Sequence, residues 1–180
     1  MPALTFVIWD LIPFIPSMHN WRRNMIFIEC DRIAVDTVAE LLARAYPRYD
    51  VYYGIKKPIL KISRPEKEAS IVVVASEAKH RREIKGIYPK VEKCLIDLLY
   101  YAINETLPLS LSDILDLWEN YLTSDKPMHF NELYRYSMRR YLNWFVSIFV
   151  YKLSKKITLN VDKRHFKTGA RNAKLVEMVS

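Results

Sequence analysis

Three residues have the types and spacing that metal-dependent hydrolysis requires: Asp50, Glu77 and Lys79. Asp50 begins a short predicted strand, and the Glu-Ala-Lys sequence that ends at Lys79 follows a second predicted strand. Two carboxylates can hold Mg²⁺, and a lysine can help to activate the attacking water. The alternative interpretation is that Asp50 caps a strand and that Lys79 belongs to a basic loop.

An acidic residue followed by Glu-x-Lys is the arrangement of the PD-(D/E)xK nucleases. The same spacing is common in α/β chains, and Glu77 lies past the apolar part of its strand. A Mg²⁺-dependent nuclease, with Asp50 and Glu77 as metal ligands, is therefore kept as an alternative function. We expect the two carboxylates not to share an ion, so the leading prediction contains no catalytic residue, no metal and no cofactor.

The remaining candidate chemistries lack their characteristic spacing. The four histidines are scattered, and neither a Gly-x-Ser-x-Gly sequence nor a glycine-rich phosphate loop is present. Cys30 and Cys94 lack the spacing of a zinc site, so buried, reduced thiols are expected.

Positive charge is concentrated in two parts of the chain, whose formal net charge is +8. Lys152 to Ser180 contains eight Lys or Arg against two acidic residues, and Lys79 to Lys93 contains six against two. Such patches indicate an anionic partner, which would be nucleic acid, an acidic protein or a membrane surface. The alternative is a solvated face plus a basic tail.

Arginines also interleave with tyrosines between Tyr134 and Tyr141, where Arg135 and Arg139 share one helical face. The alternative here is that the tyrosines pack while the arginines cap or pair with acids such as Glu119. The predicted nucleic-acid-binding residues are Lys79, Arg81, Arg82, Lys85, Arg135, Arg139 and Arg140.

The run Ile71–Val74 predicts a buried strand, because it contains four β-branched residues between polar ones. A helix follows Pro89, with apolar residues at helical spacing on one face. Those apolar residues are Val91, Cys94, Leu95, Leu98, Leu99 and Ala102, and the other face carries Lys90, Glu92, Lys93 and Asp97. This strand and helix form half of an α/β unit.

The other predicted strands are Leu4–Trp9, Met25–Glu29, Asp50–Gly54 and Ile59–Ile62. A helix capped by Asp31 ends at Pro47, and Ile33, Val35, Val38, Ala39, Leu41, Leu42 and Ala45 form its apolar side. Later helices are predicted over Asp113–Leu122 with Ser112 as cap, over Glu132–Arg140 with Asn131 as cap, and over Tyr141–Lys155.

The order of these elements predicts an α/β (α+β) fold, in which helices flank a mixed sheet and a helical subdomain follows. We expect an α/β core over residues 1–107, a helical part over 108–156 packed on the same core, and a basic tail over 157–180. The first residues lack the pattern of a signal peptide, and no apolar run is long enough to span a membrane. We therefore expect a cytoplasmic protein, and its few glycines and lack of glutamine resemble thermophile composition.

Several segments together resemble the AbiEi family, the antitoxins and transcriptional regulators of abortive-infection systems. The resemblance covers about residues 9–140. The segments that carry it are Trp9, Met18-His19, Met25–Leu42, Ile71–Ala78, Val91–Leu99 and Leu133–Arg140. Val91–Leu99 is similar to a Leu-Glu-Lys-x-Leu-x-Asp helix of the family, and Leu133–Arg140 is similar to its Tyr-Ala-x-Arg-Arg pattern.

The resemblance implies a degenerate restriction-endonuclease-like core without catalysis. It also implies a role in toxin neutralisation, with a protein partner such as a nucleotidyltransferase-like toxin. The winged helix that often precedes this domain in the family is not found ahead of it here, and Lys79 stands where relatives commonly have proline. Nucleic acid is a secondary partner in this interpretation, and a stand-alone nucleic-acid-binding protein is the remaining alternative.

Overall fold

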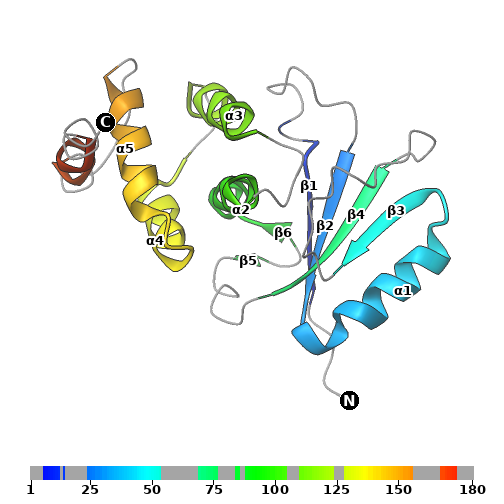
Figure 1. The fold of residues 1–180 in the computed structure, drawn as a ribbon. Helices are drawn as coiled ribbons and strands as arrows, with labels where there is room; N and C mark the ends of the chain where they lie inside the picture. The colour runs from blue at the N-terminus through cyan, green and yellow to red at the C-terminus, as the bar shows by residue number, and fades with distance from the viewer. Residues whose placement is uncertain are drawn as a thin grey trace. The chain divides into compact units, whose positions relative to one another are not determined.

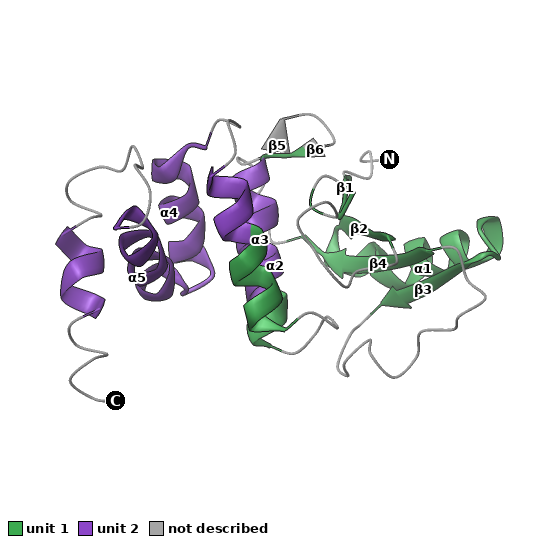
Figure 2. Cartoon of the chain, turned by 90° about the horizontal axis from the view of Figure 1, so that it is seen from above, with its two compact units in different colours: residues 1–90, 101–117 green, residues 91–100, 118–180 purple. Residues whose placement is uncertain are grey.

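The computed structural model describes residues 6–12, 14, 24–53, 69–76, 84–85, 88–104, 110–123, 128–155 and 167–173. The chain divides into two compact units (Figure 2). Unit 1 contains residues 1–90 and 101–117, and unit 2 contains residues 91–100 and 118–180. This division runs through two helices, and the predicted boundary between residues 107 and 108 stays a prediction.

A four-stranded mixed sheet forms the centre of unit 1 (Figure 1). Its strands are β1 (Phe6–Asp10), β2 (Asn24–Cys30), β3 (Tyr49–Tyr53) and β4 (Ala69–Ala75), in the order β1-β2-β4-β3. β1 is antiparallel to β2, whereas β4 lies between β2 and β3 and is parallel to both. The predicted α/β class with a mixed sheet is confirmed.

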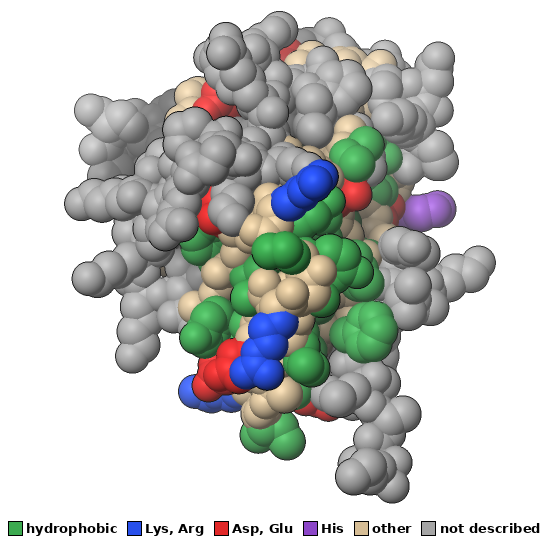
Figure 3. Space-filling model, turned by 90° about the vertical axis from the view of Figure 1, so that its right-hand side faces the viewer, with side chains coloured by type: hydrophobic (Ala, Val, Ile, Leu, Met, Phe, Trp, Pro, Cys, Tyr) green, Lys and Arg blue, Asp and Glu red, His purple; other side chains and the backbone are tan. Residues whose placement is uncertain are grey.

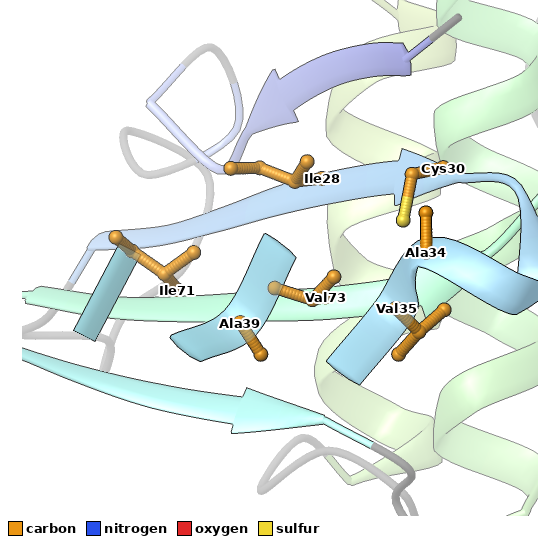
Figure 4. Packing of buried hydrophobic residues seen from close by; sticks show 7 residues of the cluster. All are labelled: Ile28, Cys30, Ala34, Val35, Ala39, Ile71 and Val73. Carbon is orange, nitrogen blue, oxygen red and sulfur yellow. The ribbon is translucent and has the colours of Figure 1, made fainter. Parts of the chain in front are cut away.

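One face of the sheet is covered by α1 (Val35–Ala45), which follows the short 3-10 helix η2 (Arg32–Ala34). Alternate residues of β2 and β4 point toward this helix, as a pleated strand requires. Figure 4 shows the buried side chains that meet there: Ile28, Cys30, Ala34, Val35, Ala39, Ile71 and Val73.

The opposite face of the sheet carries an aromatic stack. The Trp9 and Phe27 rings lie 4.1 Å apart, and Phe27 stacks on Tyr101 at 5.7 Å. Trp9 Nε1 donates a hydrogen bond of 2.9 Å to Glu29 Oε1, so this buried carboxylate has a partner. Both faces of β2 are therefore buried, which explains its nearly continuous apolar sequence.

The apolar side of α1 was predicted wrongly at three positions, since Ile33, Leu41 and Ala45 are exposed. Ile33 is 96% exposed because it lies in η2, where the tighter winding turns its side chain away from the face that α1 buries. Leu41 is 59% exposed, since it lies two residues beyond the buried Ala39 and so on the far side of the helix. Figure 3 shows hydrophobic side chains exposed among charged ones on the face that contains α1.

The other described elements are the short strands β5 (Ile84–Lys85) and β6 (Tyr88–Pro89), and the helices α2 (Val91–Ile103), α3 (Leu111–Thr123), α4 (Phe130–Arg139) and α5 (Asn143–Ser154). The α3 cap is Ser110 rather than Ser112. Asp113 N donates to Ser110 Oγ at 3.1 Å, and Ser110 N donates to Asp113 Oδ2 at 3.0 Å, which is a reciprocal capping arrangement. Asn131 lies inside α4 rather than at its cap.

Part of the predicted basic tail is a helical segment at residues 167–173 that packs on α5. A Cβ on Gly169 would overlap the carbonyl oxygen of Ser147 and would approach Tyr151 Cβ to 2.6 Å. Asn172 Nδ2 donates a hydrogen bond of 2.9 Å to Ser147 Oγ. Glycine is therefore required at this point of close approach.

The predicted buried face of α2 is confirmed at Leu95 and Leu98, which are both 0% exposed. We expect Leu95→Ala to lower the free energy of unfolding by about 2–5 kcal/mol, because it removes buried methyl groups and leaves a cavity. Urea denaturation measures this difference. A change within about 0.5 kcal/mol, the range of a surface substitution, would contradict the burial of this side chain.

Candidate functional site

Asp50 lies near the amino end of β3, half-buried, with Ser70 as its Cα partner on β4. Because the two strands are parallel, Asp50 is level with the second residue of β4 and five residues before the strand's last residue, Ala75. At about 3.3 Å per residue, that separation is roughly 17 Å along the strand. Glu77 and Lys79 lie outside the described residues, and the metal site stays a prediction.

Two residues of the predicted basic loop are described, and Lys85 is the one of them that was predicted to bind nucleic acid. Lys85 lies in β5, where its backbone pairs with Tyr88 of β6. Lys79, Arg81 and Arg82 lie outside the described residues, so their contact with nucleic acid also stays a prediction.

The arginines of the α4 segment have different surroundings. Arg135 has a 49% exposed side chain, and its Nη2 lies 3.6 Å from Glu132 Oε1. Arg139 is half-buried. Arg140 has a 12% exposed side chain, and its guanidinium carbon lies over the Tyr100 ring, 4.6 Å from the centroid.

Arg140 is held by a carboxylate that is completely buried. Its Nη2 lies 2.7 Å from Asp97 Oδ1, and its Nε donates to the same oxygen at 3.0 Å. The alternative interpretation, in which an arginine pairs with an acidic residue, therefore describes Arg140, although the partner is Asp97 rather than Glu119. This guanidinium is mostly buried, and its predicted contact with nucleic acid stays a prediction.

Asp97 has two further partners. Lys93 Nζ donates to Asp97 Oδ2 at 2.7 Å, and both side chains are 0% exposed. The Tyr136 hydroxyl lies 3.2 and 3.3 Å from the two carboxylate oxygens, and Lys93 Nζ lies 5.8 Å from the Tyr136 ring centroid. We call Lys93, Asp97, Tyr136 and Arg140 the Asp97 cluster.

Helical spacing assembles the cluster from two pairs of residues. Lys93 and Asp97 are one turn apart on α2, and Tyr136 and Arg140 are one turn apart at the end of α4. Each pair therefore projects from one side of its helix, and the two pairs meet. Burial of ions is costly, but each cation here has a charge-assisted hydrogen bond to the carboxylate.

The charged face of α2 is therefore buried as well as its apolar face, contrary to its expected amphipathic character. Glu92, Lys93 and Asp97 are 3%, 1% and 0% exposed. Glu92 Oε1 accepts a hydrogen bond of 2.8 Å from the backbone N–H of His129, just before α4 begins. The feature of the sequence that could have indicated this buried ion pair is the four-residue spacing of Lys93 and Asp97 on a largely apolar helix.

Burial also sets the protonation of several weaker acids. It raises the pKa of Cys30, and the Asp31 carboxylate raises it further. Burial likewise raises the pKa of Tyr134, and it raises the pKa of Tyr121 together with Glu92 and Cys94. Cys30 and Cys94 are buried and outside any disulfide, as predicted, and the raised pKa of the Cys30 thiol makes it a poor nucleophile at neutral pH.

Within the ranges described above, no three His, Cys, Asp or Glu side chains are grouped so that they could hold a metal ion. None of the described helices is both long enough and apolar enough to cross a membrane.

The chain belongs to a family described as "Family of unknown function (DUF6577)", whose model matches residues 1–156. No curated protein matches the chain, and no solved structure matches it. The matched region contains both the sheet of unit 1 and the whole Asp97 cluster. The resemblance to AbiEi antitoxins and to the restriction-endonuclease core stays a prediction.

We expect Asp97→Asn to lower the free energy of unfolding by about 3–5 kcal/mol, because two buried cations lose their counter-ion. Asp116→Asn is the matched control, since Asp116 is an exposed residue of α3 and should change stability by less than about 0.5 kcal/mol. Denaturant titration of both variants measures the difference. Equal effects of the two substitutions would contradict a structural role for the Asp97 carboxylate.

Proposed function

We propose that the chain is a non-catalytic, antitoxin-like or regulatory domain of a defence system that acts by binding a protein partner. The observation that carries this proposal is that the charged side chains of the Asp97 cluster are buried and bind one another. A catalytic acid or base must reach its substrate, whereas the side chains of Lys93 and Asp97 are 0% exposed. These charges therefore stabilise the fold, and we expect exposed residues on its surface to bind the partner.

The antitoxin class is supported by the residues that carry the AbiEi resemblance. Within Val91–Leu99, the motif residues Lys93 and Asp97 form one half of the cluster. Within Leu133–Arg140, Tyr136 and Arg140 form the other half. Two motifs far apart in the sequence thus have one physical explanation, because each supplies the partners of the other.

The proposed partner is a protein, for example a nucleotidyltransferase-like toxin encoded next to this chain, and the proposed place of action is the cytoplasm. A secondary contact with nucleic acid, such as a promoter, is part of the same proposal. Its support is the formal charge of +8 and the exposed side chain of Arg135.

The test is co-expression with the product of the adjacent gene. We expect the wild-type chain to restore the growth of cells that produce the toxin, and to co-purify with it. We expect Lys79→Ala to do the same, since neutralisation by binding a protein partner does not need the lysine on which the nuclease alternative depends. Metal-dependent DNA cleavage that Lys79→Ala abolishes, without any neutralisation of toxicity, would overturn the proposal.

A further inference from the structure

We propose that the corner between α4 and α5 is the surface on which the protein partner docks, and that it takes an acidic segment with apolar anchor residues. This inference rests on the proposed function. The corner is formed by Met138, Tyr141 and Trp144, whose exposed fractions are 53%, 80% and 53%. We call these three residues the α4–α5 corner, and both helices can be followed in Figure 1.

The backbone of the corner is strained at Tyr141, which has a φ of 59°. Leu142 N donates to Ser137 O at 2.8 Å, and Tyr141 N donates to Met138 O at 3.2 Å. This pair of hydrogen bonds is the Schellman motif that ends many helices. Its left-handed residue is usually glycine, because a side chain there meets the backbone.

The strain at Tyr141 has no compensation within the described structure, since the residue is 80% exposed and buries little apolar surface. Strained residues persist where the surroundings require them, and they gather at binding sites. Tyrosine, tryptophan and methionine are also enriched where protein interfaces are buried. A strained, exposed tyrosine between an exposed methionine and an exposed tryptophan is therefore explained by a partner that covers all three.

Charge identifies the kind of partner. Apart from Arg140, which is bound to Asp97, the described residues from 128 to 155 contain four Lys or Arg and one acidic residue. Arg135 lies three residues before Met138 on α4, so a basic group, which also lies 3.6 Å from Glu132, adjoins the corner at Met138. An acidic segment would be attracted to this positive charge, whereas a second copy of the chain would bring the same positive charge and be repelled.

Nucleic acid fits the corner less well than a protein segment does. Phosphate recognition depends on several cations that reach the backbone together. Arg140, the basic residue next to Tyr141, is instead 12% exposed and bound to Asp97. The apolar character of the corner points to side-chain anchors on a protein.

The probe for the test is a phage library of random 12-residue peptides, selected on the full chain. We expect enriched peptides to combine acidic residues with aromatic or aliphatic ones. Fluorescence anisotropy with a synthetic peptide should show that Trp144→Ser and Tyr141→Gly weaken binding by at least about tenfold. Ile33→Ser is the matched control, because Ile33 is 96% exposed in unit 1, and it should leave binding unchanged.

The same variants separate loss of the surface from loss of the fold. Because glycine relieves the strain, we expect Tyr141→Gly to raise the melting temperature, by about 2–4 °C, while it weakens binding. A lower melting temperature would contradict the strain that the proposal uses.

Three results of the binding experiments would overturn the docking surface. They are the absence of acidic enrichment, tighter binding of poly-U RNA or duplex DNA that depends on the same residues, and self-association that Trp144→Ser abolishes. If Tyr141→Gly and Trp144→Ser still neutralise the toxin, the surface is wrong and the proposed function stands. If the wild-type chain does not neutralise it, the proposed function itself fails.

Discussion

The organisation of unit 2 depends on the buried carboxylate of Asp97. Transfer of an isolated carboxylate out of water is prohibitive unless cations and hydrogen-bond donors replace the solvent. Lys93, Tyr136 and Arg140 supply those donors, and they come from both α2 and α4. Hydrogen bonds with fixed directions specify how the two helices pair more narrowly than apolar contacts alone, because a shift of one turn would leave buried ions without partners.

Local patterns in the sequence were sufficient to predict most of the described helices and the longer strands. The β-branched run at Ile71–Val74 predicted β4, and the apolar spacing that includes Leu95 predicted the register of α2. The prediction for the charged side of α2 was wrong, because it rests on the assumption that the polar face of an amphipathic helix is exposed to solvent. That assumption fails when the counter-ions come from elsewhere, and Arg140 is 43 residues beyond Asp97. The candidate site was hidden for the same reason, since Lys93 and Asp97 could be paired from sequence while their long-range partners could not.

Unit 2 therefore inverts the usual distribution of side chains at two places. Charged groups that normally face water are buried in the Asp97 cluster, while Tyr141 and Trp144, which normally bury much of their surface, are exposed. The first inversion is stable because every ion is paired. The second has no such explanation within the described structure, and at Tyr141 it coincides with a backbone conformation that favours glycine. The proposed role in recognition rests on this second inversion, in which the scaffold exposes aromatic side chains.

The most direct test of a structural rather than catalytic role for the cluster is to replace all of it by apolar residues. The variant carries Lys93→Met, Asp97→Leu, Tyr136→Phe and Arg140→Met, and its free energy of unfolding and its neutralisation of the co-expressed toxin are measured together. If the cluster only supports the scaffold, the variant should fold with a stability within a few kcal/mol of the wild type, and it should still neutralise the toxin, because a fully apolar replacement leaves no buried ion unpaired. A variant that folds with similar stability but has lost neutralisation would contradict the account, since the charges themselves would then be required for function.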